Sequence, residues 1–240
     1  MTQQKGVIYM MPCPIADHSS VWQVLPESNR EVMNSLDYFI VENIRTARRF
    51  LSKAGIARLI DELEFVELNE HTTSVADVER MLKPILAGRS AAVISEAGVP
   101  GIADPGADIV ALAHRKGIRV VPLVGPSSIV LVMMASGQNG QSFSFVGYLP
   151  IKEGERMQRI KQLERRAQQE NQAQIFIEAP YRNIRLMESL LKTLSPKIRL
   201  TVAVDITSED EYIATRSIEE WRKQPLPNIE KRPTIFVLGI

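Results

Sequence analysis

Short apolar runs alternate with amphipathic segments along the first half of the chain, and this alternation restricts the possible folds more than any other feature. The runs that read as buried strands are residues 7–11, 38–41, 65–68, 91–95 and 119–123. Between two of them, residues 75–86 carry apolar side chains at spacings of three and four, as one face of a helix does. Parallel neighbouring strands need such long connections. The first half is therefore predicted to be an α/β domain with a mostly parallel sheet.

The second half mixes the same elements in a different order. Its predicted strands are residues 143–146, 175–177, 200–204, 212–215 and 234–238, and its predicted helices are residues 156–169 and 184–194. The third and fourth strands follow one another without a helix, so we expect them to be antiparallel and the sheet to be mixed. Gly125-Pro126 interrupts regular structure near the middle of the chain. The expected domains are residues 1–123 and 124–240.

The amino-acid composition restricts the cellular compartment and the classes of partner that we expect for this chain. Lys and Arg number 29 against 28 Asp and Glu, so no overall charge attracts nucleic acid or an anionic membrane, and an RNA site has to be a local patch. A single cysteine, Cys13, excludes an internal disulfide and a cysteine-rich zinc site. There is no run of eighteen apolar residues, and the first apolar run is too short for a signal peptide. We expect a soluble cytoplasmic protein with no metal and no membrane association.

The segment Ser95-Glu-Ala-Gly-Val-Pro-Gly-Ile-Ala-Asp-Pro-Gly106 connects a predicted buried strand to a helix expected at residues 107–116. Open α/β sheets bind ligands at such an edge, because glycine allows close approach to the backbone and helix N-termini offer free N–H groups. The glycine spacing differs from the dinucleotide pattern G-x-G-x-x-G, which disfavours NAD. Ala107-Asp108 replaces the Lys-Ser/Thr pair of a Walker loop, so nucleoside triphosphate binding is also disfavoured.

Together with Val120-Val-Pro-Leu-Val-Gly-Pro-Ser-Ser128, this loop closely resembles the tetrapyrrole methylase superfamily, in particular its ribosomal RNA small-subunit methyltransferase I branch. Shorter matches occur in the order expected for that branch, at residues 41–51, Asn69-Glu-His71, Gly147-Tyr-Leu-Pro150 and Ile177-Glu-Ala-Pro-Tyr-Arg182. The resemblance covers nearly the whole chain. It implies two α/β domains, a homodimer, and S-adenosylmethionine bound in a cleft between the domains.

The resemblance also implies which residues contact the cofactor. In the first domain they are Ser95, Glu96, Ala97, Gly98, Val99, Pro100, Ile102 and Asp104, with Gly125, Pro126, Ser127 and Ser128 on the opposite wall. In the second domain they are Glu178, Ala179, Pro233 and Thr234, around the adenine. The implied activity is ribosomal RNA processing by ribose 2′-O-methylation.

A sulfonium methyl group is already activated, so transfer requires alignment and, for a hydroxyl acceptor, a base. His71, beside Glu70, follows a predicted strand at the edge that carries the glycine loop, and Glu42 ends another strand there. These three are the candidate catalytic residues; for the histidine a surface or structural role is the alternative. Arg45, Arg48 and Arg49 on the following helix, and Arg182, are candidate RNA-binding residues, and a solvated helix face is the alternative for the first three. The charged helix at residues 156–169 is expected at the surface.

The chain departs from the branch at four places. Ile15-Ala16-Asp17 replaces Ile-Gly-Asn, Asn43 replaces Asp, and Val204-Asp205 replaces Arg-Glu. The branch also has a Gly-Glu pair near the position at which this chain has Arg232-Pro233. Most of these changes concern the expected acceptor side, whereas the cofactor loops match. Two alternatives therefore stay open beside RNA methylation, namely methylation of a small tetrapyrrole-like ring and S-adenosylmethionine binding by a non-catalytic regulator.

Overall fold

The computed structural model describes residues 4–17, 20–69, 72 and 74–240, and its contacts divide the chain into unit 1, Met1–Ser127, and unit 2, Ser128–Ile240. The boundary expected after Leu123 lies in the same connecting segment, which runs between the last strand of unit 1 and the first helix of unit 2. Among the helices of these ranges, none is both long and apolar enough to cross a bilayer.

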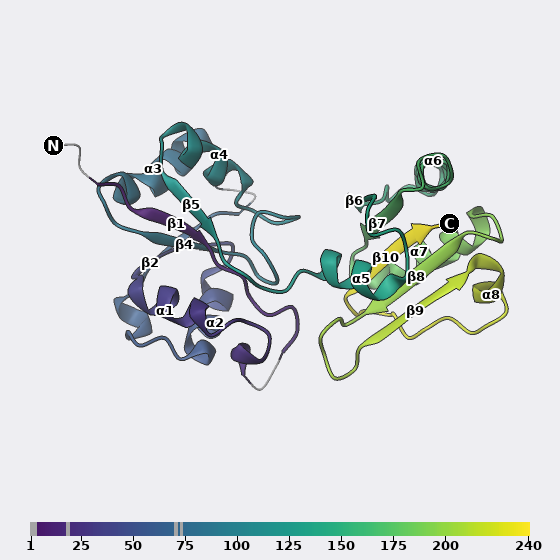
Figure 1. The fold of residues 1–240 in the computed structure, drawn as a ribbon, viewed down its shortest axis with the longest axis horizontal. Helices are drawn as coiled ribbons and strands as arrows, with labels where there is room; N and C mark the ends of the chain where they lie inside the picture. Colours follow the sequence, from purple (N-terminus) through teal and green to yellow (C-terminus); the bar gives the residue numbers. More distant parts are fainter. Residues whose placement is uncertain (1–3, 18–19, 70–71, 73) are drawn as a thin grey trace. The chain divides into compact units, whose positions relative to one another are not determined.

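Unit 1 is built on a parallel sheet with strand order β3-β2-β4-β1-β5 (Figure 1). Its strands are β1 Val7–Met10, β2 Tyr38–Val41, β3 Glu64–Glu67, β4 Ala91–Ile94 and β5 Arg119–Pro122. Every neighbouring pair is parallel. The α/β fold and the strand positions predicted for the first half are therefore confirmed, and all five strands end at one edge of the sheet.

Helices cover both faces of this sheet. They are α1 Ser28–Ser35, α2 Ile44–Ala54, α3 Val75–Leu86 and α4 Ala107–Arg115, with short 3₁₀ turns at Val21–Gln23 and Ile60–Glu62. Successive strand residues point to opposite faces. Ile40 and Val93 accordingly pack with α3 and α4, whereas Phe39 and Ala92 pack with α1 and α2. The two layers explain why the inner strands β2 and β4 are apolar at every position.

Unit 2 contains a mixed sheet with strand order β6-β7-β10-β8-β9. Its strands are β6 Phe143–Tyr148, β7 Ala173–Ile177, β8 Arg199–Val204, β9 Tyr212–Ser217 and β10 Thr234–Gly239. Only the β6–β7 pair is parallel, and β8 and β9 pair antiparallel as the short link between them predicted. The mixed sheet is thus confirmed.

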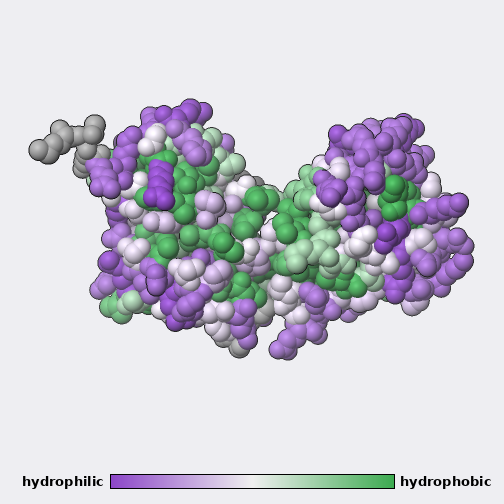
Figure 2. Space-filling model, in the orientation of Figure 1, coloured by the Kyte–Doolittle hydropathy of each residue, from purple (hydrophilic) through white to green (hydrophobic). Residues whose placement is uncertain are grey.

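The helices of unit 2 are α5 Ser128–Ser136, α6 Glu153–Glu170, α7 Asn183–Thr193 and α8 Ile218–Arg222, with a 3₁₀ turn at Pro180–Arg182. One face of the sheet packs with α6, α7 and α8, and the other with α5. Sequence analysis missed α5 because it is apolar all round and shows no helical period; Val130 and Met134 stay exposed on it, and apolar side chains gather there in Figure 2.

The outer face of α6 is strongly hydrophilic, as expected for a surface helix (Figure 2). The expectation is wrong for two of its charged residues, because Arg156 and Glu164 are buried. Arg156 donates from Nε to Ser189 Oγ at 3.1 Å and from Nη1 to the Ile151 carbonyl at 2.6 Å. Glu164 accepts the backbone N–H of Ser195 at 2.9 Å. Hydrogen bonds to the next elements compensate the burial of these charges.

Candidate functional site

The glycine loop of unit 1 is held at the carboxyl edge of the sheet by the segment that follows β1. Cys13 and Gly98 exchange two backbone hydrogen bonds, from Cys13 N–H to the Gly98 carbonyl at 2.8 Å and in return at 3.1 Å. Gly98 has φ +69°, and a Cβ placed on it would lie 3.4 Å from the Pro126 carbonyl oxygen. The left-handed backbone therefore favours glycine at this position, and the segment that follows β5 lies in van der Waals contact with it.

The segment after β5 is itself packed tightly against the one after β1. A Cβ on Gly125 would lie 2.3 Å from both Cβ and Cγ of Pro12. From the other side, the buried Asn29 donates from Nδ2 to the Val124 carbonyl at 2.9 Å. The structure thus brings together two of the predicted cofactor segments, residues 95–104 and 125–127. Ser128, next along the chain, starts α5 in unit 2.

Carboxylates gather where β2 and β4 end. Glu42 Oε2 accepts the backbone N–H of Glu96 at 3.1 Å, and Thr46 Oγ1 donates to Glu96 Oε1 at 3.3 Å. The pKa of the Asp104 carboxyl is raised from 3.8 to about 6: burial contributes most, the charges of Glu42 and Glu96 also raise it, and a hydrogen bond from Ser95 lowers it. Three acidic groups in one half-buried place create a negative potential that favours a cationic ligand.

Burial also determines the state of Cys13. It raises the pKa of this thiol, and the nearby Asp104 carboxylate adds to the rise. The thiol is therefore neutral at physiological pH and contributes to packing.

Helix α2 presents the predicted basic residues beside the carboxylates. Asn43 caps it, because its Oδ1 accepts the N–H groups of Arg45 at 2.9 Å and Thr46 at 3.2 Å. Asparagine and aspartate cap helices about equally well, so this departure from the branch keeps the cap. Arg45 and Arg49 are exposed, whereas Arg48 forms an ion pair with Asp61 and lies over the Phe65 ring at 5.8 Å.

A cavity of about 750 Å³ lies between α2 and residues 13–17. Arg49 and Lys53 line it together with the apolar Ile15 and Phe50, and Glu96 lies at its wall. Lys53 forms a loose ion pair with Asp17 at 3.6 Å. Two of the candidate RNA-binding arginines, Arg48 and Arg49, thus border one hollow of unit 1 together with Glu96 of the acidic cluster.

In unit 2, Glu178 and Ala179 follow β7 and form a tight local network. The buried Glu178 Oε1 accepts from the Ala179 N–H at 2.7 Å and from Nε and Nη2 of Arg182 at 2.8 and 2.6 Å. Arg182 also donates from Nη1 to the Tyr181 hydroxyl at 2.8 Å. The guanidinium of Arg182 is therefore already engaged within the protein.

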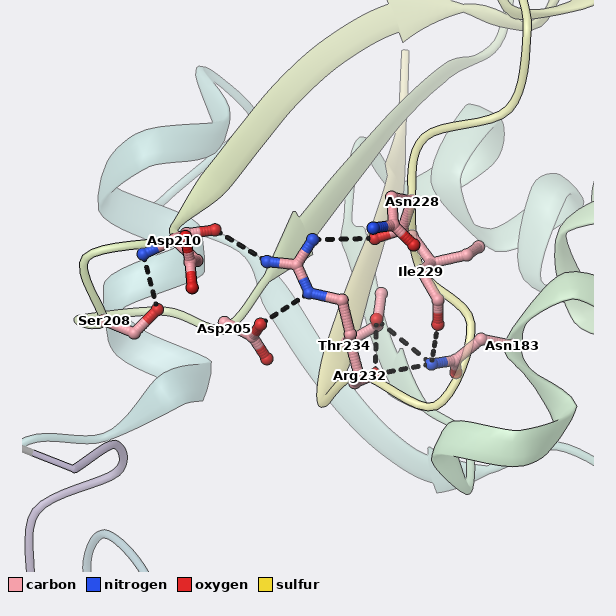
Figure 3. A network of polar contacts seen from close by, with 8 residues as sticks. All are labelled: Asn183, Asp205, Ser208, Asp210, Asn228, Ile229, Arg232 and Thr234. Atoms are coloured by element: carbon pink, nitrogen blue, oxygen red, sulfur yellow. Dashed lines mark hydrogen bonds and ion pairs between the residues drawn. The ribbon is translucent and has the colours of Figure 1, made fainter.

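Thr234, which follows Pro233 in the chain, lies in a second network of unit 2 (Figure 3). The buried Asn183 donates from Nδ2 to Thr234 Oγ1 at 3.1 Å and to the Arg232 carbonyl at 2.7 Å. Arg232 donates from Nε to Asp205 Oδ2 at 2.6 Å, and the Pro233 carbonyl accepts the Asp205 N–H at 2.9 Å. Two departures from the branch pattern, at Asp205 and at Arg232, thus form an ion pair with each other.

Two of the predicted catalytic residues, Glu70 and His71, lie outside the described residues. The third, Glu42, stands in the acidic cluster described above. Sequence reasoning missed Thr46, Pro12 and Asn29, which hold the cofactor segments in place; Asn29 and Val124 are 95 positions apart, and no local pattern connects them.

No family model matches the chain. Curated relatives named "Ribosomal RNA small subunit methyltransferase I" match nearly all of it: the Vibrio cholerae protein is 28% identical over 89% of this chain and 69% of its own length. The Haemophilus influenzae protein is 28% identical over 99% of this chain and 80% of its own length. The Mesorhizobium japonicum protein is 30% identical over 78% of this chain and 60% of its own length. Among solved structures, the methyltransferase CobJ has a TM-score of 0.63 at 17% identity, covering 98% of this chain and 94% of CobJ.

These similarities bear out the predicted resemblance to the tetrapyrrole methylase superfamily. The Thermus thermophilus uroporphyrin III C-methyl transferase, with a TM-score of 0.58 at 15% identity over 98% of this chain and 97% of its own, has the same fold. The two structural likenesses concern the fold alone, whereas the sequence relatives confirm the predicted branch. Since the sequence relatives are all named methyltransferases, the prediction that this chain is a methyltransferase is confirmed as well.

Proposed function

We propose that this protein transfers a methyl group from S-adenosylmethionine to RNA of the small ribosomal subunit, at a ribose 2′-hydroxyl. The observation that carries the proposal is the sequence similarity to proteins of that name over 89% and 99% of the chain for the Vibrio and Haemophilus proteins. The resemblance further suggests a homodimer in the cytoplasm. Analytical ultracentrifugation tests the dimer.

The residues of unit 1 fit the proposed cofactor. S-adenosylmethionine supplies a methyl group on a positively charged sulfur, and it carries an ammonium group as well. Glu42, Glu96 and Asp104 supply negative charge beside the loop. The backbone at Gly98 is open to a ligand because it carries no side chain, and its neighbours on two sides keep it in place. In unit 2, the ordered backbone at Ala179 and Thr234 supports the proposed contacts with the adenine.

The acceptor hydroxyl has to lose a proton as it gains the methyl group. Glu42 is one proposed acceptor of that proton, since the hydrogen bond from the Glu96 N–H orients its carboxylate. His71, with Glu70 beside it, is the other proposed base. Replacing Glu42 by Gln and His71 by Ala in turn, and measuring methyl transfer at saturating cofactor, distinguishes the two, because loss of the base lowers the rate of transfer even when the cofactor site is filled.

Arg45, Arg49 and Lys53 support RNA as the acceptor. They are four residues apart, so they follow one face of α2 at intervals of about 6 Å. The two arginines are exposed, and the lysine has only a loose partner. Such a row of cations provides the local positive patch that a chain of nearly zero net charge needs for binding phosphates.

The decisive experiment compares small-subunit ribosomal RNA from cells with and without the protein by mass spectrometry of its nucleosides. We expect one ribose methyl mark to disappear and to return with the intact gene but not with Gly98→Arg. Gly55→Arg is the matched control, because Gly55 has a similar φ of +72° with no atom within 4 Å of an added Cβ. Calorimetry of both variants with S-adenosylmethionine should show loss of binding only for Gly98→Arg.

Persistence of every methyl mark in cells lacking the protein would refute RNA methylation. If the purified protein then still produced S-adenosylhomocysteine in extract, a different acceptor such as a tetrapyrrole-like ring would be favoured. If it bound the cofactor without turnover, a regulatory role would replace the enzymatic one.

A further inference from the structure

Unit 2 carries a hollow of about 600 Å³ with one exposed tyrosine in its lining and a second exposed tyrosine next to a lining residue. Residues 148–151, Ala179 and Arg182 line it. The side chain of Tyr148 is 62% exposed, and that of Tyr181, next to Arg182, is 71% exposed. Large apolar surface in water is unfavourable and marks an interaction site when it is gathered at a hollow. We therefore expect a ligand to bind in this hollow.

The tyrosines are brought together by the sheet. Tyr148 ends β6 and is paired with Ile177 at the end of the parallel strand β7, from which the chain continues directly into the turn that carries Tyr181. Arg182 lines the hollow together with Tyr148 and donates from Nη1 to the Tyr181 hydroxyl at 2.8 Å. The two rings therefore belong to one small surface, which we call the tyrosine surface: Tyr148, Ile151, Tyr181 and Arg182.

This surface is held rigid from beneath. The guanidinium of Arg182 lies 5.0 Å from the Tyr181 ring centroid and donates to its hydroxyl, while the buried Glu178 carboxylate accepts two hydrogen bonds from Arg182. On the other side, the buried Arg156 donates a hydrogen bond from Nη1 to the Ile151 carbonyl at 2.6 Å. An exposed ring whose orientation is fixed in advance loses little conformational entropy when a ligand stacks on it.

Three exposed cations lie near residues of the tyrosine surface, along the chain or through a backbone hydrogen bond. Lys152 and Arg185 are exposed, and the exposed Lys231 donates its backbone N–H to the Pro180 carbonyl at 3.2 Å. Lys152 pairs loosely with Glu155 at 3.4 Å, and both side chains are largely in water. Flat aromatic faces with mobile positive charges around them match one class of ligand, an unpaired nucleobase joined to phosphates.

We propose that the tyrosine surface stacks an unpaired base of the RNA substrate. The inference rests on the proposed function and deepens it, because it names a place in unit 2 where single-stranded RNA binds. Arg182 acts here as a positioning residue: it orients Tyr181 and leaves the phosphates to Lys152, Arg185 and Lys231.

The test measures binding of a short fluorescent oligoadenylate, and of an oligouridylate of equal length, by fluorescence anisotropy at several salt concentrations. Tyr148→Ala and Tyr181→Ala should each weaken oligoadenylate binding about ten-fold, with a smaller effect on oligouridylate. Tyr148→Phe and Tyr181→Phe should stay within about two-fold, because the ring remains. The slope of log affinity against log salt should not change in any of them, since no phosphate contact is lost.

Phe143→Ala is the matched control, because Phe143 is an exposed aromatic residue on the same strand, at the end away from the hollow. It should leave oligonucleotide binding unchanged. Thermal melting should be unchanged in all the tyrosine variants. If both alanine variants bind oligoadenylate as tightly as the unaltered protein, or if the unaltered protein binds neither oligonucleotide, the tyrosine surface is not a base-stacking site.

Failure of the proposed function is a separate result. Methyl transfer is measured on small ribosomal subunits from cells lacking the protein. If the unaltered protein methylates them and the alanine variants do so with the same KM, RNA methylation stands and base stacking is refuted. If the unaltered protein methylates none, the proposed function fails, and oligonucleotide binding alone decides on the tyrosine surface.

Discussion

Asp104→Asn should make the protein more stable at neutral pH while removing cofactor binding. Burial and the charges of Glu42 and Glu96 raise the pKa of Asp104 from 3.8 to about 6. A shift of about two pH units corresponds to about 3 kcal/mol. The residue is only half-buried and solvent screens part of the interaction, so about 1–2 kcal/mol is the expected destabilisation from its charge.

The pH dependence follows from the direction of the shift. A carboxyl whose pKa is raised by folding binds its proton more tightly in the folded state, so its contribution to stability falls as pH rises from about 4 to about 6. Asparagine is neutral throughout. The melting temperature of Asp104→Asn should therefore exceed that of the unaltered protein by about 4 °C at about pH 8 and match it at about pH 4.

The affinity for the cofactor should fall in Asp104→Asn, whereas the stability of the protein should rise. Calorimetry at about pH 8 should show a large loss of S-adenosylmethionine affinity in Asp104→Asn, and the affinity of the unaltered protein should fall below about pH 6 as the carboxyl gains its proton. Glu209→Gln, an exposed carboxylate of unit 2, is the control and should change neither property. Equal melting temperatures at about pH 8, or a gain that persists at about pH 4, would refute the electrostatic reasoning.

Three further changes test other contacts. Arg182→Ala leaves the buried Glu178 carboxylate without its cation and should cost about 3 kcal/mol in thermal melting; a change below about 1 kcal/mol would contradict the burial of this pair. Gly125→Ala places a Cβ against Pro12 and should destabilise unit 1 by about 1–3 kcal/mol in urea unfolding, whereas an unchanged midpoint would show that the two segments separate easily. Arg49→Ala should lower the salt slope of RNA binding by about 1 in anisotropy titrations, and an unchanged slope would place the phosphates elsewhere.

The order of the strands was readable from the sequence, as were helices α2, α3, α4, α6 and α7 but not α1 and α8, because each predicted element depends on neighbouring residues. The apolar runs at β2 and β4 and the apolar stripe of α3 indicate their own structure. Helix α5 escaped the same reasoning, since a helix that is apolar all round has no period to detect. The glycine loop after β4 was identified from its own residues, and its resemblance to a family identified the cofactor and the implied site residues.

What the amino-acid order alone determined is thus local: which segments form strands and helices, where the chain turns, and which glycine-rich loop is the candidate for cofactor binding. Only the tertiary structure decided the properties that depend on several distant segments. The pKa of Asp104 depends on Glu42, 62 positions earlier in the numbering, because the order β3-β2-β4-β1-β5 makes β2 and β4 neighbours and their parallel direction puts both carboxyl ends at one edge. Electrostatic interaction and burial act through space, and the strand order sets those distances.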